Sequence, residues 1–345
     1  MKRCILMLAA AAVLFAAMGA LAYSGSVVQI PEKASALELV ILISLSLGIM
    51  SFLFGMITSD YSWVDRLWST APVLFAWIYA LKADFSPIVL LPVIVVSLWG
   101  ARLTFNFARR GGYSGMEDYR WPILRKRIGN EWLWQLFNLL FICGFQIGLF
   151  ILFTSPLAPL SRMSAAVSGS VSDLFTAIPP AGYAALAAML FFIGLETVAD
   201  QQQWDFHKAK ALSKAAKTPV AGKTTGAGKP REEDAQWLAA YPWKDDISQG
   251  FLSSGLFSII RHPNYLGELG VWWSLYLFSA AVQATLFHWS ISGAVLLSVL
   301  FVGSTAFTEG ITASKYPEYE RFQASTPALI PLNLKGGSSA AREDS

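Results

Sequence analysis

Residues 268–307 read ELGVWWSLYLFSAAVQATLFHWSISGAVLLSVLFVGSTAF, a long stretch of mostly apolar side chains. The hydrocarbon core of a bilayer is crossed by a helix of about 20 apolar residues, so this stretch is about twice the length of one span. His288, Trp289 and Ser290 interrupt it with polar and interfacial side chains. The sequence therefore predicts two membrane helices, near 268–286 and 290–307, joined at these three residues.

Further apolar runs of similar length lie upstream, at 4–22, 36–57, 67–82, 86–108, 133–157 and 181–199. The first follows Lys2 and Arg3 and ends in small residues, which is the pattern of a cleaved signal peptide as well as of a first span. The sequence thus predicts an all-α fold, a polytopic membrane helical bundle of about seven to eight spans. We expect an N-terminal span or signal segment over 1–30, a membrane domain over 36–335, and a disordered tail over 336–345.

Composition excludes several classes of protein. The chain has 345 residues, of which 54% are hydrophobic and 14% charged, whereas a soluble domain carries roughly 25% charged residues. A disordered protein, a nucleic-acid binder and an ordinary cytosolic enzyme are excluded, and the net charge of +3 implies no polyanionic partner. Cys4 and Cys143 are too few for a disulfide framework, and His207, His262 and His288 form no metal-binding pair.

The distribution of basic residues predicts the topology. If alternate loops face the cytosol, 22 Lys and Arg lie on that side and 3 on the other. This asymmetry follows the positive-inside rule and predicts a cytosolic C-terminus. We expect a multi-pass protein of the endoplasmic reticulum if the source is eukaryotic, or of the inner membrane if it is bacterial. Residues 208–235 begin with a stretch rich in Lys, Ala, Gly and Thr, which predicts a flexible cytosolic insert.

Polar side chains are costly in an apolar chain, so their positions indicate where chemistry occurs. Residues 258–268 (SIIRHPNYLGE) bring together Arg261, His262, Asn264, Tyr265 and Glu268. A cation, an imidazole, an amide, a phenol and a carboxylate within eight residues suit a phosphorylated, hydrogen-bonding cofactor, although Arg261 would equally serve as an anchor on lipid phosphate.

Three other places also carry polar residues. Glu196 and Asp200 are four residues apart, on one face of a helix, and either bind a ligand or form a solvated helix end. Arg102 lies inside a predicted span and is followed by the polar stretch up to Trp121. The tail after the last span is amphipathic and either folds back over the cytosolic face or lies on the membrane surface. Asp60 and Asp65 are further candidates, or else ordinary loop acids.

These motifs resemble the C-terminal domain of the steroid 5α-reductase family. The resemblance rests on Glu196 and Asp200, then GLFSIIRHPNYLGE (255–268), an apolar hairpin, and YPEYERFQASTPALIP (316–331). It is closest to an uncharacterised bacterial-type branch, which also carries patterns such as DRLW (65–68) and ARLTFNFARR (101–110), and it covers about residues 55–332. Sterol C14-reductases and isoprenylcysteine methyltransferases share versions of RHPNYLGE.

The resemblance implies NADPH-dependent reduction of a carbon–carbon double bond conjugated to a carbonyl, with NADPH held at cytosolic loops of the bundle. By position, Asn264, Glu268 and Asp200 match cofactor-binding residues, and Glu196 stands where steroid reductases have Asn. Arg102 matches the basic residue of the HYxxR segment of that family. Trp99 stands where those enzymes have the Tyr that polarises the substrate carbonyl, which argues against a steroid substrate.

We therefore expect the protein to be a membrane oxidoreductase that acts on a lipidic substrate, which enters from the bilayer. Stabilisation of the developing enolate requires a hydrogen-bond donor, and the candidate catalytic residues are Asp60, Trp99, Tyr113 and Tyr119. The candidate cofactor-binding residues are Arg102, Arg120, Glu196, Asp200, Arg261, His262, Asn264, Tyr265, Glu268, Lys315 and Tyr319.

An alternative hypothesis is that the protein is a membrane methyltransferase that uses S-adenosylmethionine. It accounts for the RHPNY motif equally well. Such relatives have two adjacent Glu residues after the last hairpin, whereas Glu309 here stands between Thr308 and Gly310. The broken pair favours the reductase.

Overall fold

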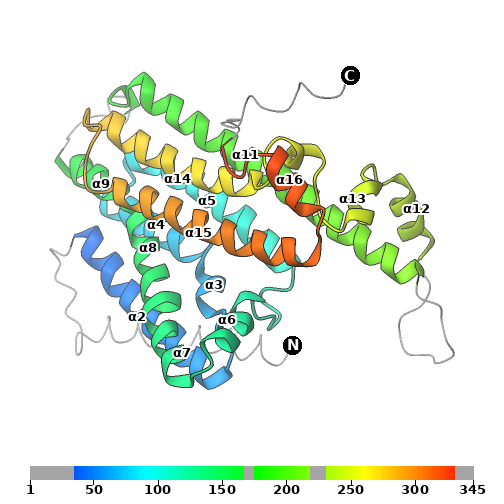
Figure 1. The fold of residues 1–345 in the computed structure, drawn as a ribbon. Coiled ribbons are helices and arrows are strands. Elements are labelled where there is room, and N and C mark those ends of the chain that lie inside the picture. Colours follow the sequence, from blue (N-terminus) through cyan, green and yellow to red (C-terminus); the bar gives the residue numbers. More distant parts are fainter. Residues whose placement is uncertain (1–34, 167–174, 218–230, 331–345) are drawn as a thin grey trace, which may run out of the picture. The chain divides into compact units, whose positions relative to one another are not determined.

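A computed structural model describes residues 35–166, 175–217 and 231–330 of the chain (Figure 1). Over these ranges the structure is helical and contains no strand, which confirms the all-α prediction. The predictions for residues 1–30 and 336–345 lie outside the described residues. The helices are α2 (Ala36–Thr58), α3 (Trp63–Leu67), α4 (Ala71–Lys82), α5 (Pro87–Arg109), α6 (Arg120–Ile128), α7 (Glu131–Phe137), η1 (Asn138–Phe145), α8 (Gln146–Thr154), α9 (Leu157–Ala166), α11 (Pro180–Lys217), α12 (Glu232–Ala240), α13 (Lys244–Gln249), η2 (Gly255–Ser258), α14 (Pro263–Val282), α15 (Ile291–Lys315) and α16 (Tyr319–Ser325).

Five helices of the described chain are long and apolar enough to cross a membrane. This fits an integral membrane protein, but the predicted count of seven to eight spans is not confirmed. The five are Ala36–Thr58, Pro87–Arg109, Glu131–Thr154, Pro180–Ala216 and Ile291–Lys315.

Two sequence predictions need correction. The run at 67–82 is not one helix: α3 ends at Leu67, and α4 begins only at Ala71, because Pro72 favours the first turn of a helix rather than its interior. The predicted flexible insert over 208–235 is wrong for residues 208–217, which continue α11, and for residues 232–235, which begin α12. The rest of the predicted insert up to 230 lies outside the described residues.

The apolar stretch over 268–307 divides into two helices as predicted, although only the second, α15, is among the five long apolar helices. Helix α14 ends at Val282 and α15 begins at Ile291. In the connection, Nε2 of His288 lies 3.3 Å from the amide nitrogen of Gln283, and its Nδ1 lies 2.9 Å from the hydroxyl of Ser290. The polar side chains that marked the break in the sequence therefore hydrogen-bond one another inside the turn.

The chain forms two compact units, each built from distant segments. Unit 1 comprises residues up to Leu190 together with Trp272–Leu297. Unit 2 comprises Phe191–Val271 together with Ser298 onward.

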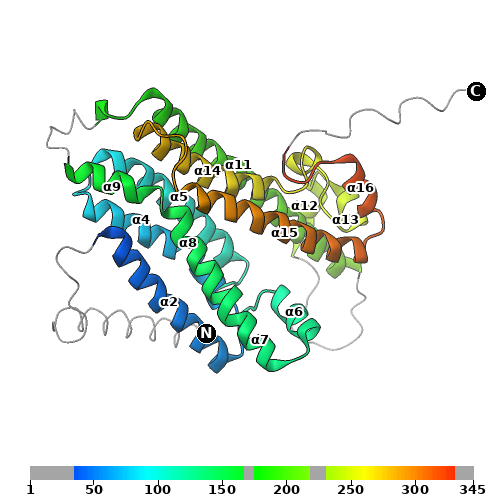
Figure 2. The same cartoon turned by 60° about the vertical axis from the view of Figure 1, so that its left-hand side comes forward.

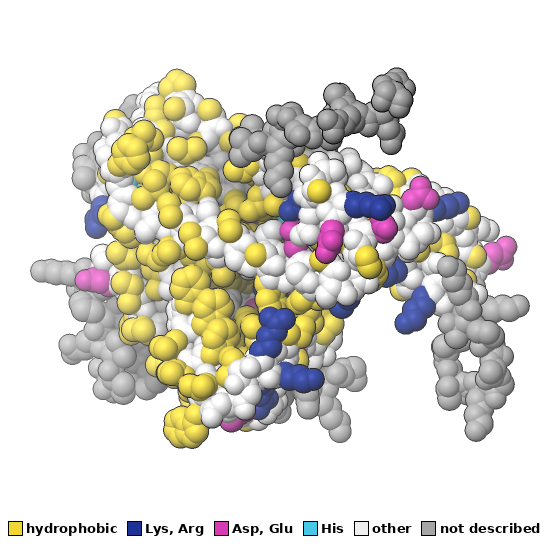
Figure 3. Space-filling model, viewed as in Figure 1, with side chains coloured by type: hydrophobic (Ala, Val, Ile, Leu, Met, Phe, Trp, Pro, Cys, Tyr) yellow, Lys and Arg dark blue, Asp and Glu magenta, His cyan; other side chains and the backbone are white. Residues whose placement is uncertain are grey.

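Unit 1 contains a layered group of apolar helices. Helix α2 packs on α8 and α4, and α4 packs on α5 and α9 (Figure 2). The outer face of α2 leaves large side chains such as Leu45, Ile49 and Ile57 more than half exposed. Hydrophobic side chains cover the area around α2 and α8, while Lys and Arg gather over α6 (Figure 3). This distribution suits a helix face in contact with lipid and a polar end outside the hydrocarbon.

Gly293 permits a close helix contact in unit 1. A Cβ added there would lie 2.3 Å from the backbone carbonyl of Leu152 and 2.4 Å from the amide nitrogen of Phe153. Backbone atoms cannot rotate away, so we expect Gly293→Ala to lower the free energy of unfolding by about 1–3 kcal/mol. Thermal unfolding in detergent measures this. Gly303→Ala on the same helix, where a Cβ meets nothing within 4 Å, is the matched control and should not destabilise. Equal melting temperatures for Gly293→Ala and the wild type would contradict the close contact.

In unit 2 the extension of α11 forms a scaffold for residues 231–260. Ala199, Phe206 and Ala209 of α11 form a buried cluster with Tyr241, Leu252 and Phe257. The side-chain oxygen of Gln202 accepts a hydrogen bond from the backbone N–H of Leu256 at 3.0 Å. These contacts fix the segment that leads into Arg261 and His262.

Candidate functional site

The RHPNY motif lies at the start of α14. Pro263 is the first residue of this helix, where its fixed φ is favourable and its missing N–H costs nothing. The ring of Tyr265 stacks on His262 with centroids 5.0 Å apart and meets Phe301 edge-on at 4.7 Å. Local helix geometry therefore fixes the orientation of the motif within unit 2.

Arg261 and His262 bind a carboxylate of the chain itself. Arg261 donates from Nε to Oε1 of Glu309 at 2.6 Å and from Nη2 to Oε2 at 3.0 Å, a bidentate pair. Nε2 of His262 lies 2.8 Å from Oε1, and the amide of Gln323 donates to Oε2 at 2.8 Å. Both oxygens of Glu309 are thus occupied by partly buried partners.

The same motif holds the tail. Nη1 of Arg261 donates to the carbonyls of Gln323, at 2.9 Å, and of Thr326. The backbone N–H groups of Arg261 and His262 donate to the carbonyls of Pro327 and Ala328, at 2.9 and 3.1 Å. We call Arg261, His262, Glu309, Gln323 and Thr326 the tail clamp. Of the two alternatives for the tail, the structure shows a return onto the chain, and the tail ends on the RHPNY motif.

Unit 2 also contains three buried acids, which we call the buried acid cluster. Glu196 and Asp200 on α11 and Glu268 on α14 are 4%, 6% and 4% exposed. Gly267 brings the two helices together, because a Cβ there would lie 2.7 Å from Cβ of Glu196. Three carboxyl groups withdrawn from water are expensive unless they serve a ligand or a network.

The tail adds an aromatic group. The ring of Tyr319 is buried and meets Phe251 edge-on at 5.0 Å, and Phe322 stacks on the same ring at 5.6 Å. Burial, and then the negative charge of Glu309, raise the pKa of Tyr319 well above its usual range. Lys315, in contrast, is exposed at the end of α15. Of these two predicted cofactor-binding residues, only Lys315 is open to solvent.

In unit 1, Asp60 and Tyr113 meet at Arg66. The buried guanidinium donates to Oδ2 of Asp60 at 2.7 Å and to the carbonyl of Gly112 at 3.1 Å. The hydroxyl of Tyr113 donates to the carbonyl of Arg66 at 3.4 Å. Asp60, a candidate catalytic residue, is therefore engaged in an ion pair with a buried arginine.

A second ion pair and a buried acid complete this region. Arg120 forms a bidentate pair with Asp118. Its Nε donates to Oδ1 at 2.8 Å and its Nη2 donates to Oδ2 at 3.0 Å. The indole N–H of Trp121 donates to Oδ2 of Asp65 at 2.8 Å. Burial is the main cause that raises the pKa of Asp65, against the opposing effect of Arg120.

The buried Asp65 predicts a dependence of stability on pH. Because its pKa is higher in the folded than in the unfolded chain, the folded state binds the proton more tightly, and stability falls as pH rises above about 4. We expect Asp65→Asn, which keeps an acceptor for Trp121, to flatten this fall between pH 4 and 7 in thermal unfolding experiments in detergent. The exposed Asp84 provides the control variant, Asp84→Asn. A slope unchanged by Asp65→Asn would contradict the assignment.

The remaining predicted residues of unit 1 differ in their exposure to solvent. Trp99 is fully buried and meets Trp272 edge-on at 4.8 Å, so its ring belongs to the apolar core of the unit. Arg102 is half-buried on α5, one turn further along. Tyr119 is 54% exposed.

Sequence reasoning missed the central role of Glu309. It is the single carboxyl side chain in α15, and this isolation within an apolar helix was the available signal. It also missed Glu117, whose Oε1 accepts a hydrogen bond from the backbone N–H of Tyr61 at 2.9 Å.

Comparisons with known proteins place the chain among relatives that lack an assigned activity. The model of a family described as "Protein of unknown function (DUF1295)" matches residues 51–326. A Schizosaccharomyces pombe protein named "Uncharacterized protein C594.04c" is 33% identical over 299 residues, which cover 84% of this chain and 78% of the relative. No solved structure matches the chain.

Proposed function

Because the chain belongs to the family of proteins of unknown function DUF1295, which is related to steroid 5α-reductase-like proteins, we propose that it is a membrane oxidoreductase. In this proposal a hydride passes from NADPH to a conjugated carbon–carbon double bond of a lipidic substrate. The resemblance of the RHPNYLGE and tail segments suggested this reaction, and the buried acids of unit 2 support it.

The buried acid cluster is the observation that carries the proposal. Buried carboxyl groups are unusual between apolar helices. Here they provide hydrogen-bond acceptors from Glu196, Asp200 and Glu268. The ribose hydroxyls and the carboxamide N–H groups of a nicotinamide nucleotide are donors that match such acceptors. Asn264 and Tyr265, both half-buried at the start of α14, would add an amide and a phenol. When bound, NADPH supplies the hydride.

The tail clamp changes which cations would hold the phosphates. Arg261 and His262 are committed to Glu309, so we assign them to positioning the motif and not to phosphate binding. Lys315 is exposed and is the proposed phosphate ligand in unit 2. Arg120 was also predicted to bind the cofactor, but its guanidinium already pairs with Asp118.

Reduction also requires a proton for the second carbon and a donor for the carbonyl oxygen. Asp60 is less suited than predicted, since it is paired with Arg66. Tyr113 and Tyr119 remain the proposed donors, because a phenol O–H donates a hydrogen bond and the indole N–H of Trp99 is not a practical proton source.

The methyltransferase alternative gains no support from Glu309. Both oxygens of this carboxylate are taken up by the tail clamp, so it acts as a structural group in this chain. We therefore keep the reductase as the proposed function.

Isotope transfer tests the reaction. Purified protein is incubated with NADPH deuterated at C4 of the nicotinamide, on either face, and with a panel of lipids that carry α,β-unsaturated ketones or aldehydes. We expect one lipid to gain one deuterium and one proton, as measured by mass spectrometry, with matching formation of NADP⁺. Transfer of a labelled methyl group from S-adenosylmethionine, with no deuterium transfer to any lipid, would overturn the proposal.

A further inference from the structure

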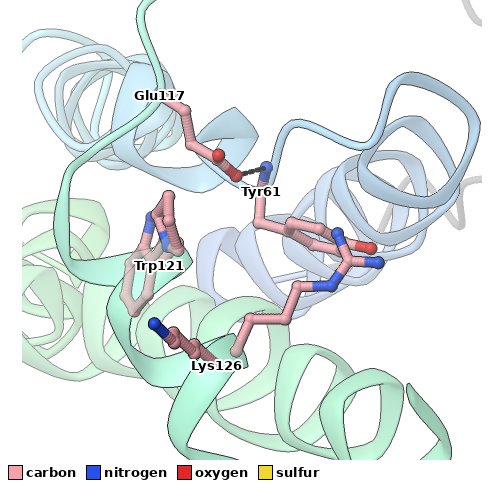
Figure 4. A pocket seen from close by; sticks show the side chains of 6 residues that line it. Tyr61, Glu117, Trp121 and Lys126 are labelled. Carbon is pink, nitrogen blue, oxygen red and sulfur yellow. Dashed lines mark hydrogen bonds between the residues drawn. The ribbon is translucent and has the colours of Figure 1, made fainter. Parts of the chain in front are cut away.

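Unit 1 contains a pocket of about 300 Å³ that the proposed reaction does not use. Its lining comprises Tyr61, Glu117, Trp121, Pro122, Arg125 and Lys126 (Figure 4). Tyr61 directly follows the first described span, and the other residues lie in the connection between the spans α5 and α7–α8. The pocket therefore lies at the ends of membrane helices, at the level where headgroups meet water.

The surroundings of the pocket support this position. Arg125, Lys126 and Arg127 form a basic last turn of α6. Trp132 and Leu133, at the start of the following helix α7, are 87% and 56% exposed. Basic and aromatic side chains flanking a span are typical of the interface between membrane and water.

The two ends of the pocket carry opposite charge. Figure 4 shows Glu117 and Lys126 at opposite ends, with Trp121 between them. Glu117 has one oxygen bound to the N–H of Tyr61, and loss of hydration raises the pKa of its carboxyl group. A cation placed beside it would replace the missing hydration. The pocket thus favours a ligand that is positive at one end and negative at the other.

Lys126 is the cation that is available to such a ligand. Arg125 is already engaged, with its guanidinium 2.8 Å from Oε2 of Glu131 and over the ring of Tyr61 at 5.4 Å. Lys126 is exposed and makes no ion pair or hydrogen bond within the described residues. An anionic group of the ligand would therefore bind at Lys126.

The walls between the charged ends are aromatic and held in place. Tyr61 and Trp121 are each 3% exposed. The hydroxyl of Tyr61 accepts a hydrogen bond from Gln135 at 2.8 Å, and the indole of Trp121 donates to Asp65. Fixed aromatic rings beside a carboxylate recognise an ammonium group. The volume is at the lower limit of small-molecule pockets, which suits a headgroup but not a whole dinucleotide.

We propose that this pocket binds a phosphoethanolamine group, with its ammonium at Glu117 and its phosphate at Lys126. The primary ammonium is preferred to a quaternary one because Glu117 offers a hydrogen-bond acceptor. A membrane phospholipid or a soluble phosphoethanolamine ester would present this same chemistry. The inference does not depend on the proposed reductase activity.

Lipid titration tests the pocket. The full-length protein, delipidated in detergent, is titrated with phosphatidylethanolamine, with phosphatidylglycerol, and with soluble glycerophosphoethanolamine, and thermal unfolding is followed. A ligand of the folded state raises the melting temperature. We expect phosphatidylethanolamine to bind at least tenfold more tightly than phosphatidylglycerol. A saturable shift with the soluble ester at lower concentration than with the lipid would identify a soluble ligand of the same chemistry.

Three variants separate the pocket from general surface charge. Glu117→Gln keeps an acceptor for the N–H of Tyr61 but should remove the preference for ethanolamine. Lys126→Gln should weaken binding of both lipids about tenfold. Arg127→Gln, next in sequence but outside the lining, is the matched control and should change little. An equal affinity of the wild type for both lipids, an ethanolamine preference that persists in Glu117→Gln, or equal losses in Lys126→Gln and Arg127→Gln would each overturn the proposal.

Discussion

Replacing Glu309 by glutamine is expected to destabilise the protein by about 3–5 kcal/mol, because removal of one partner leaves a buried cation uncompensated. The side chains of Arg261 and Glu309 are 10% and 7% exposed, so water cannot replace the lost carboxylate. The loss also releases Gln323, and with it a contact of the tail. Thermal or denaturant unfolding in detergent measures the effect.

A surface pair provides the control for this prediction. Glu318 and Arg321 are 62% and 84% exposed, so Glu318→Gln should change stability by less than about 1 kcal/mol. The double variant Arg261→Gln with Glu309→Gln should be less destabilised than the sum of the single variants, because the two side chains contact each other. Strictly additive effects would show that the pair does not hold the tail.

The second large effect is expected at the buried acids. Glu268→Gln and Asp200→Asn remove the charge but keep the shape, and each should weaken NADPH binding about 10- to 100-fold, the equivalent of a charge-assisted hydrogen bond of about 1.5–3 kcal/mol. Asn264→Ala should act in the same direction. Binding is measured by equilibrium titration of the purified protein in detergent.

Folding must be separated from binding in these variants. NADPH affinity is therefore measured well below the melting temperature of each variant, which thermal unfolding in detergent gives. Glu320→Gln, an exposed acid of the same unit, should leave NADPH affinity unchanged. If NADPH affinity is unchanged in all three variants, Glu268→Gln, Asp200→Asn and Asn264→Ala, the proposed cofactor site is wrong.

Apolar length predicted most of the helices, and local chemistry explains where it failed. The break at His288–Ser290 was visible because three polar or interfacial residues interrupt a long apolar run. The start of α4 was not visible in the sequence, because Pro72 lies inside the apolar run at 67–82, and hydropathy alone suggests that this run is continuous. Residues 208–217 were predicted as a loop from composition, yet Ala and Lys also favour helix, and Ala209 packs in the buried cluster of unit 2.

The sequence indicated which residue types gather at the candidate site, but not which side chains contact one another there. The motif around Arg261 was predicted to bind a cofactor, and in the structure Arg261 pairs with Glu309. Its partner Glu309 lies 48 residues away, and spacing along one sequence cannot show which acid a given arginine will meet. The same holds for Trp121, whose contact with Asp65 joins positions 56 residues apart.

The central claim is that this chain binds NADPH through the buried acids of unit 2. Parallel titration of the purified protein with NADPH, NADH and S-adenosylmethionine, followed by thermal unfolding, tests it most directly. We predict a saturable rise in melting temperature with NADPH that is lost in Glu268→Gln. A rise with S-adenosylmethionine alone, or no rise with NADPH, would contradict it.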